Sequence, residues 1–293
     1  MIDLVAVNRA ETFERIHDPL AERGIRLHHV PATERTLTLT GDDAERTDEF
    51  DVGFVYPSRF MEGGVADALL DVPWLNGREA VVTSRNKGGV IAHLDAAAVP
   101  VPRTEMVSNP VDQGDLVDVF ERFDPPVVVK PNSATRGVGV AKVHDLDSFL
   151  GVVDYLDLVH DYRATGDKSF LVQEYVTGAT DYRAMVLDGE YVGAVERRLP
   201  DAALESGQWK HNVHRGAKAT AVDLSDDLRR LAERVAAELD ISLLGVDLLV
   251  SEDRTVVSET NARPTVDDAT KYENGFYDRL ADAIERTAGS KRR

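Results

Sequence analysis

The sequence predicts an α/β protein with a small parallel α/β domain at its N-terminal end and a strand-rich, α+β lobe at its C-terminal end. Short apolar runs alternate with segments of helical spacing over about the first 80 residues, which is typical of a parallel sheet covered by helices. Beyond Gly178 the pattern becomes strand-rich and includes a hairpin turn. The length of 293 residues allows two domains, or one large enzyme with several lobes.

The N-terminal domain is expected to alternate strands and helices, with Gly24 ending the first helix. Its elements are strand Ile2–Val7, helix Glu11–Arg23, strands Ile25–Val30 and Asp51–Tyr56, and a helix around Gly64–Leu70. No G-x-G-x-x-G turn follows the first strand, which argues against a dinucleotide-dependent oxidoreductase.

The central part is expected to begin with a helix, Asn86–Ala97, that Thr83 or Ser84 caps and Val99–Pro102 ends. The elements that follow are helix Val111–Arg122, strand Val127–Lys130, the glycine-bearing loop Pro131–Val140, helix Leu146–His160 and strand Phe170–Val176.

The C-terminal lobe is expected to open with a hairpin whose turn is Asp188-Gly189. Its elements are strands Tyr182–Leu187 and Tyr191–Arg197, helix Asp226–Glu238, strands Leu243–Val250 and Thr255–Asn261, and a final helix Tyr277–Thr287.

The composition limits the class of partner and the cellular compartment. The 52 acidic and 34 basic residues give a net charge of −18, which argues against binding to nucleic acid or anionic membranes. No apolar run reaches membrane-spanning length, no secretory signal is visible, and the absence of cysteine excludes thiolate metal sites, so we expect a cytoplasmic protein. Only eight of the basic residues are lysine, which favours a salt-rich, halophilic cytoplasm over an ordinary acidic protein.

The strongest candidate site lies on the last two strands. Glu259 and Asn261 are two residues apart on one strand, so their side chains point to the same face. If a three-residue turn, Glu252–Arg254, joins the two strands, Asp247 lies directly opposite Glu259. Two carboxylates and an amide oxygen are hard ligands that suit Mg²⁺, with phosphate oxygens completing the octahedron. The alternative is an acidic, solvent-exposed hairpin face.

A buried strand and the loop after it offer a second candidate. Lys130 ends the strand, and the loop that contains Gly137 and Gly139 could close over phosphates. There is no G-K-[ST] sequence, so this is not a Walker A loop. The alternative is a strand-end lysine followed by an ordinary β-hairpin.

Two further segments suit a nucleotide or an anion. Leu171–Val176 could present backbone groups to an adenine edge, with Asp181 accepting from ribose hydroxyls, although a plain core strand is the alternative. The cationic segment Trp209–Gly216, with Glu196–Arg198 before it, could hold a γ-phosphate or an anionic substrate. A surface salt-bridge cluster is the alternative reading of these cations.

Taken in order, these motifs resemble the ATP-grasp superfamily, and within it the RimK-like amino-acid (α-L-glutamate) ligases. The series is a lysine before a small-residue loop, Q-E-Y, D-x-R, E-R-R, N-x-H-R-G, G-V-D and E-x-N. The resemblance runs from about Thr83 to the last helix. It implies an ATP-grasp fold with a pre-ATP-grasp α/β domain over residues 1–82, a central subdomain over 83–176 and a C-terminal subdomain with the metal site over 177–293.

The resemblance also implies roles for single residues. The family's two phosphate-contacting lysines match Lys87 and Lys130. Its adenine hinge matches Glu174, Tyr175 and Val176, and its ribose-side acid matches Asp181. Its segment that contacts nucleotide and metal matches Lys210, His211 and Asn212. Its magnesium ligands match Asp247, Glu259 and Asn261. Positions near the transferring phosphate and the acyl group match Arg183, Arg198, Arg215 and Arg263.

The sequence departs from the family pattern around the acceptor side. Where the family has N-A-S-P-G, this chain has Asn261-Ala-Arg-Pro-Thr265, so we expect Arg263 to contact a phosphate or a substrate carboxylate. H-R-G-G is replaced by His214–Ala217, the acid before the first lysine is Asn86, and the connection Leu199–Gln208 is longer than usual.

The resemblance implies an ATP- and Mg²⁺-dependent ligase, with Mn²⁺ as an alternative ion. A carboxylate attacks the γ-phosphate to give an acyl phosphate, and an amino acid such as glutamate then forms an amide. The carboxylate would belong to a small molecule, a peptide or a protein, and a homo-oligomer is compatible with the sequence. The alternative function is an ATP-binding regulatory or scaffold protein that has lost ligation.

Overall fold

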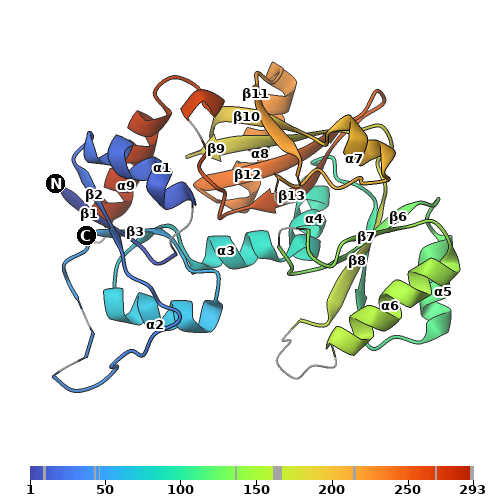
Figure 1. Cartoon of the computed structure of the whole chain (residues 1–293), viewed down its shortest axis with the longest axis horizontal. Coiled ribbons are helices and arrows are strands. Elements are labelled where there is room, and N and C mark those ends of the chain that lie inside the picture. The colour runs from blue at the N-terminus through green and yellow to red at the C-terminus, as the bar shows by residue number, and fades with distance from the viewer. Residues whose placement is uncertain are drawn as a thin grey trace.

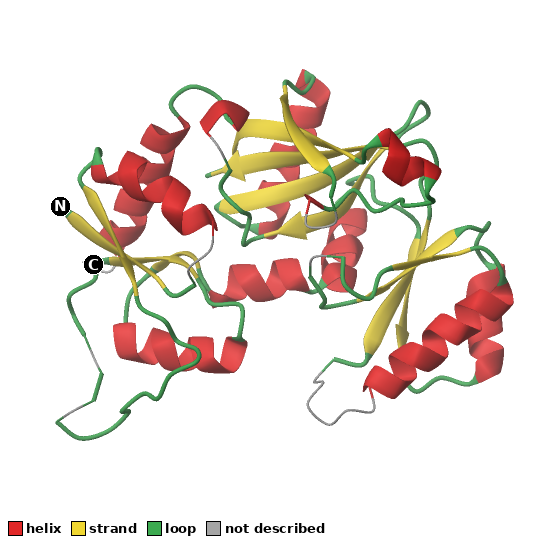
Figure 2. Ribbon diagram, in the orientation of Figure 1, coloured by secondary structure: helices red, strands yellow, loops and turns green. Residues whose placement is uncertain are grey.

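Three β-sheets organise the chain in a computed structural model (Figures 1 and 2). The structure describes residues 1–8, 11–42, 44–45, 47–135, 137–160, 167–213, 216–267 and 269–290. Sheets A and B lie at opposite ends of the molecule, sheet C lies at the upper centre of the view, and two short helices run below it from sheet A toward sheet B. Each sheet is drawn from a separate stretch of sequence, so the chain completes one sheet before it starts the next.

Sheet A is a parallel sheet with the strand order β2-β1-β3-β4. Its elements are β1 (Ile2–Ala6), α1 (Glu11–Ala21), β2 (Ile25–His29), β3 (Val52–Val55), α2 (Phe60–Leu70) and β4 (Trp74–Asn76). The chain leaves β1 toward β2 on one side and leaves β3 toward β4 on the other. The sheet therefore has a topological switch point between β1 and β3.

The last helix of the chain, α9 (Phe276–Ser290), returns to sheet A. Leu280 and Ile284 are fully buried in a cluster that also contains Leu4 of β1 and Leu243 of sheet C. This packing ties the two ends of the chain together and joins sheet A to sheet C through one apolar core.

Helices α3 (Arg78–Arg85) and α4 (Lys87–Ala96) connect sheet A to the rest of the molecule. The expected cap at Thr83 or Ser84 is wrong, because both residues lie inside α3. Asn86 ends α3 and begins α4, and its side-chain Oδ1 accepts a hydrogen bond from the N–H of Gly89 at 3.1 Å. Asparagine is a favourable N-cap because its oxygen satisfies a free helical N–H.

Sheet B is antiparallel, with the order β5-β8-β6-β7. Its elements are β5 (Thr104–Ser108), α5 (Gln113–Glu121), β6 (Val127–Pro131), β7 (Ala141–Val143), α6 (Leu146–His160) and β8 (Ser169–Glu174). Phe120, Phe149 and Phe170 bring both helices onto one face of this sheet in a single apolar cluster. That packing leaves the other face free to meet sheet C.

Sheet C is also antiparallel, with the order β11-β10-β9-β12-β13. Its elements are β9 (Thr180–Leu187), β10 (Glu190–Arg198), α7 (Asp201–Glu205), β11 (Lys218–Val222), α8 (Asp226–Leu239), β12 (Leu243–Val250) and β13 (Thr255–Asn261). Ala232 and Val235 of α8 are fully buried in one cluster with Ala184 and Val246 of the sheet. The opposite face of the central strands carries charged side chains.

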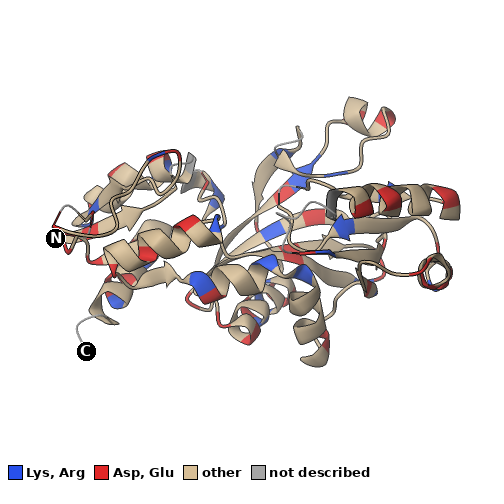
Figure 3. Cartoon of the chain, turned by 90° about the horizontal axis from the view of Figure 1, so that it is seen from below, with Lys and Arg blue, Asp and Glu red and all other residues tan. Residues whose placement is uncertain are grey.

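The predicted fold class is confirmed: a small parallel α/β sheet precedes two antiparallel sheets with helices. The sequence does not predict strands β4, β5, β7 and β11, and all four lie at the edge of a sheet. Within the described residues, no helix combines the length and the apolar character needed to cross a membrane. Acidic positions recur on helices at both ends of the molecule (Figure 3).

Candidate active site

The site predicted on the last hairpin forms on the charged face of sheet C. Asp247 of β12 pairs directly with Glu259 of β13, as predicted. The predicted turn is wrong, because Val250 pairs with Thr255 and the turn therefore holds four residues. A β-bulge at Ser258, which has no partner in the pairing, shifts the register back by one residue and restores the expected pairing.

Asp247 lies in a chain of alternating charges. Its carboxylate accepts two hydrogen bonds from Arg183 of β9, at 2.7 and 2.8 Å, and is 2.9 Å from Nη2 of Arg197 on β10. Arg197 also donates to Asp181 at 2.5 and 2.9 Å. The side chains of Asp247 and Arg197 are only 6% and 8% exposed, so each needs the other's charge inside the protein.

These contacts determine the protonation of the two carboxylates. Burial would raise the pKa of Asp247, but Arg183 and Arg197 outweigh it and hold that pKa below its ordinary value. Burial raises the pKa of Asp181; Arg197 opposes this effect, and the Asp247 charge adds to it. Asp247 is therefore the permanently ionised member of the pair.

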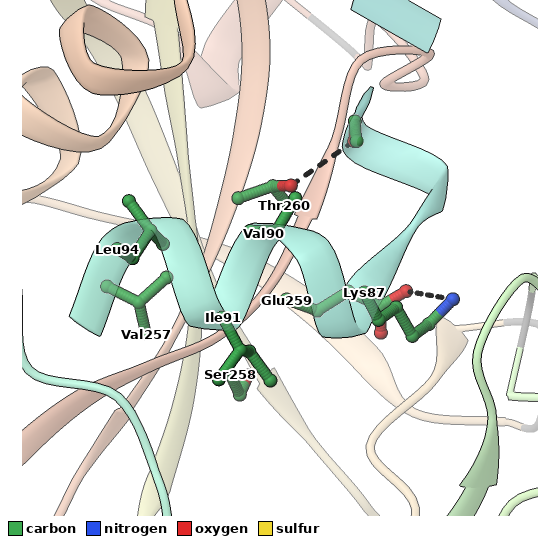
Figure 4. A pocket seen from close by; sticks show the side chains of 9 residues that line it. Lys87, Val90, Ile91, Leu94, Val257, Ser258, Glu259 and Thr260 are labelled. Atoms are coloured by element: carbon green, nitrogen blue, oxygen red, sulfur yellow. Dashed lines mark hydrogen bonds and ion pairs between the residues drawn. The ribbon is translucent and has the colours of Figure 1, made fainter. Parts of the chain in front are cut away.

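Glu259 lies beside the first predicted phosphate lysine. Lys87 is 6% exposed at the start of α4, and its Nζ is 3.4 Å from Glu259 Oε1 (Figure 4). The same ammonium donates to the backbone oxygens of Ala134, in the loop after β6, and of Asn132, at 3.5 Å to the latter. Lys87 thus connects that loop to the candidate metal ligands.

The second predicted lysine, Lys130, reaches the same face from sheet B. Its buried Nζ donates to Gln173 Oε1 at 3.0 Å and to the backbone oxygen of Ser258, the bulged residue, at 3.4 Å. Burial lowers the pKa of Lys130 to about 8, and Glu259 only partly offsets that effect. Sheets B and C therefore meet at a lysine that is poorly stabilised as a cation.

Asn132, which the sequence analysis did not single out, holds the loop after β6 against α4. It is 8% exposed, and its Oδ1 accepts from the N–H of Gly88 at 2.8 Å while its Nδ2 donates to Asn86 Oδ1 at 3.0 Å. The signal in the sequence that could have predicted this role is the position of Asn132, which follows Lys130 and Pro131 at the end of the predicted strand.

The predicted adenine hinge follows β8. The side chain of Glu174 accepts from the N–H of Arg103 and pairs with Arg254, both at 2.7 Å, so it is fixed against the protein. Val176 is buried, and the ring of Tyr175 packs edge-on against Trp209 at 5.9 Å.

Cations surround these aromatic rings. Lys142 Nζ lies 4.5 Å from the Tyr175 ring centroid and 5.4 Å from that of Trp209, and Lys210 Nζ lies 5.7 Å from the latter. The segment predicted to contact nucleotide thus packs against the hinge through Trp209. The sequence motifs give Trp209 no role beyond its place at the start of that cationic segment.

The rest of that segment also lies near the site. His211 Nδ1 is 2.8 Å from the backbone oxygen of Arg197, and Asn212 packs close to Gly137 in the loop after β6. A Cβ on Gly137 would lie 2.5 Å from Asn212 Oδ1, and Gly137 has a φ of +66°, so this position requires glycine. Arg215, predicted to lie near the transferring phosphate, falls outside the described residues.

The predicted Arg198 faces away from this site, and its neighbour Arg197 takes the inward position. The Arg198 side chain is 68% exposed and pairs with Asp201. The cause is a bulge in the β9–β10 hairpin between Tyr191 and Gly193, which moves the partner of Asp181 from Glu196 to Arg197. A one-residue shift exchanges the two faces of a strand.

Replacing Arg197 with methionine should reduce both stability and activity, whereas Arg198→Met should change neither. Without Arg197, Asp181 loses its ion pair and Asp247 keeps only Arg183, and breaking a buried pair costs about 3–5 kcal/mol. Denaturant unfolding and ATP turnover of the two variants provide the measurement. Equal effects in both would contradict the inward assignment of Arg197.

Arg263, the departure from the family pattern, points toward sheet A. Its guanidinium donates to the backbone oxygen of Tyr56 and, at 3.0 Å, to Asn8 Oδ1. Its backbone N–H donates to Asn261 Oδ1 at 2.9 Å. Burial and the nearby charge of Arg85 lower the pKa of Arg263 to about 10.

The donor set fits a hard divalent cation. Among the described residues, no three histidine, cysteine or carboxylate side chains gather at one point. The candidate set is instead two carboxylates and an amide, three oxygen ligands of the kind that Mg²⁺ accepts when phosphate oxygens supply the rest. The carboxylates of Asp247 and Glu259 now contact Arg183, Arg197 and Lys87, so positive charge already lies where a cation would bind.

The fold is similar to those of a solved ligase and a solved synthetase. The chain is similar to the D-alanine–D-alanine ligase of Bacillus anthracis complexed with ATP, with a TM-score of 0.70, 16% identity, and coverage of 99% of this chain and 98% of that one. It is also similar to the D-cycloserine synthetase DcsG, with a TM-score of 0.69, 20% identity, and coverage of 97% and 99%. At these identities the likeness establishes the ATP-grasp fold.

Sequence comparison adds the family. The chain is 29% identical over 228 residues to a probable alpha-L-glutamate ligase of Aliivibrio fischeri (strain MJ11), covering 76% of this chain and 71% of that protein. These relatives agree with the expected class, an ATP-dependent carboxylate–amine ligase. The sequence model of the RimK-like ATP-grasp domain matches residues 84–279. Because this match spans more than half of the chain, the protein belongs to the RimK-like ATP-grasp family.

Proposed function

We propose that this protein uses ATP and Mg²⁺ to join a carboxylate to the amino group of an amino acid through an acyl phosphate. The observation that carries the proposal is the convergence of two lysines and two carboxylates from three parts of the chain. Lys87 of α4 pairs with Glu259, and Lys130 of sheet B reaches the backbone next to it. Phosphoryl transfer needs this combination, because the cations neutralise charge that develops on the transferring phosphate.

The proposed roles follow the position of each residue. Lys87 and Lys130 bind the ATP phosphates, and the hinge binds the adenine: Glu174, Tyr175 and Val176. Asp181 lies on the ribose side, and the segment against the hinge contacts the nucleotide: Lys210, His211 and Asn212. We assign Arg183 and Arg197, rather than Arg198, to stabilising the transferring phosphate and the acyl group. Arg215, outside the described residues, keeps the role that the family resemblance implies, and Arg263 is assigned to the substrate side, toward sheet A.

The metal is proposed to bind between the last two strands. Its ligands would be Asp247, Glu259 and Asn261, and the lowered pKa of Asp247 keeps that carboxylate ionised. Bound Mg²⁺ would supply positive charge to the nucleotide phosphates, and Mn²⁺ accepts the same oxygen ligands. Arg183 and Arg197 would then exchange part of their contact with Asp247 for contact with the anionic reactants.

The substrates are proposed from the relatives. Their name, probable alpha-L-glutamate ligase, supports glutamate as the amine. A solved ATP-grasp ligase of similar fold, PsnB, is complexed with a precursor peptide, which supports a peptide as one possible acceptor. We also propose three structural parts, 1–82, 83–176 and 177–293, because each contains the strands of one sheet.

ADP release should require Mg²⁺, a carboxylate and an amino acid together. The test is a coupled ADP assay with L-glutamate and a panel of small acids and peptides, at low and at molar potassium chloride. Omitting the amino acid should stop steady turnover, because the acyl phosphate then has no nucleophile. Nucleotide binding without any acid-dependent ADP release across the panel would favour the regulatory alternative.

A further inference from the structure

Two arginines from different parts of the chain meet at the carboxyl edge of sheet A. Arg263, beyond the end of β13, donates to the backbone oxygen of Tyr56. Arg85, at the end of α3, donates to the backbone oxygen of Ser58 at 2.8 Å and of Ser133 at 3.0 Å. Both guanidinium groups are thus anchored on the short segment that follows β3.

Neither arginine has an acidic partner in the part of the chain that the structure describes. Their acceptors there are backbone oxygens and the amide oxygen of Asn8, and Arg85 also lies over the Phe60 ring at 5.1 Å. This is unusual in a chain of net charge −18, where arginines such as Arg183 and Arg197 pair with carboxylates. Two close, partly buried cations without an anion leave several guanidinium N–H donors for a ligand.

The location is one where α/β sheets bind ligands. Asn8 follows β1 and Tyr56 follows β3, and these two strands flank the switch point of sheet A. Ligands of open α/β sheets bind outside the carboxyl ends of the strands at such a point, because the connections diverge there and leave a crevice. Arg263 reaches both residues that border this switch point.

The same arginine touches the proposed reaction site. Its backbone N–H holds the side chain of Asn261, and Arg85 precedes Lys87 by two residues. A molecule held by the two guanidinium groups would therefore extend from sheet A toward the metal ligands and the phosphate lysines. A carboxylate matches the planar, two-pronged geometry that guanidinium groups offer.

We propose that Arg263 and Arg85 bind a carboxylate of a substrate that does not itself react, at the switch point of sheet A. This inference rests on the proposed ligase function and identifies the substrate as an acid with a carboxylate besides the reacting group, or as the incoming amino acid held by a carboxylate. Both sources present the same chemistry to the arginines. Arg263 is then a specificity residue, which explains why it replaces the small residue of the family pattern.

The test measures the binding of two acids, L-glutamate and glutarate, by calorimetry with ADP and Mg²⁺ present. The proteins are the wild type, Arg263→Met, Arg85→Met and the control Arg59→Met, whose exposed side chain pairs with Glu62 at 3.5 Å. We expect at least one acid to bind to the wild type. Its affinity should fall by about tenfold to a hundredfold in Arg263→Met and Arg85→Met, and should not change in Arg59→Met. A loss for glutamate identifies the amino acid as the source, and a loss for glutarate alone identifies the acyl substrate.

Other results would overturn the proposal. One such result is that neither acid binds to the wild type. Another is that Arg263→Met binds the acid as tightly as the wild type does. A third is that Arg263→Met loses affinity for ADP rather than for the acid, which would make Arg263 a phosphate ligand. If Arg263→Met does not fold, Arg263→Lys can replace it in the test. Lysine keeps the positive charge but lacks the paired N–H donors of a guanidinium group, so this variant should bind the acid more weakly than the wild type. Because binding needs no turnover, failure of this site is distinct from failure of Mg²⁺-dependent ADP release.

Discussion

Replacing Asp247 with alanine should abolish Mg²⁺-dependent ADP release and also lower the stability of the ligand-free protein. The catalytic loss should be at least about a thousandfold, because the proposed metal site loses an ionised ligand and the transferring phosphate loses its oriented charges. The stability loss should be about 3–5 kcal/mol, because Arg183 and the buried Arg197 are left without their shared carboxylate. Enzyme turnover and denaturant unfolding measure the two effects separately.

The control for this experiment is Asp253→Ala, which removes an exposed carboxylate from the turn that follows β12. It should change stability by less than about 0.5 kcal/mol and leave turnover intact. Full activity of Asp247→Ala would refute the metal assignment. Loss of activity with unchanged stability would show instead that the two arginines do not depend on Asp247 in the folded protein.

Strand parity predicts the pairing of Asp247 with Glu259, because a longer turn and a bulge in the hairpin offset each other. The predicted turn has three residues, whereas the structure has four turn residues and a bulge at Ser258. Either change alone would have paired Asp247 with a neighbour of Glu259. The side chains of Asp247 and Glu259 would then lie on opposite faces of the sheet. A bulge depends on the tertiary setting of the strand, which local sequence does not encode.

The same limit explains why the sequence does not show that Arg197, rather than Arg198, faces inward. The sequence contained both arginines, and only the bulge near Gly193 determines which one faces Asp181. Gly193 has a φ of +146°, and a Cβ there would lie 2.6 Å from the backbone oxygen of Lys271. The glycine was therefore a usable signal for an irregular strand. The contact with Lys271 that makes glycine necessary comes from a distant part of the chain.

Long-range contacts also account for what was missed at sheet A. Arg263 was singled out as a departure, but its partners Asn8 and Tyr56 lie more than 200 residues earlier in the chain. Helical and strand periodicity located most of the elements because it depends on neighbours a few residues apart. Pairing between separate sheets depends on the completed core, including the return of α9 to sheet A.

Replacing Lys130 with methionine should reduce activity without the loss of stability expected for Asp247→Ala. Turnover should fall by about a hundredfold to a thousandfold, because a cation that neutralises the transferring phosphate is lost. The free energy of unfolding should stay the same or rise by up to about 2 kcal/mol at pH 7. Burial lowers the pKa of Lys130 from 10.5 to about 8, which corresponds to a cost of about 3 kcal/mol for keeping the ammonium charged.

Methionine removes that cost but leaves Gln173 Oε1 without its donor. The unpaired oxygen should lower the free energy of unfolding by about 1–3 kcal/mol. The pH dependence separates these contributions. Between pH 8 and 10.5 the unfolded wild type binds more protons at this lysine than the folded protein, so its stability should rise with pH across that window. Lys130→Met should lack this rise, and the exposed Lys218→Met should retain it. A variant as unstable as Asp247→Ala would mean that the buried ammonium supports the fold, rather than being held there at a cost for phosphate binding.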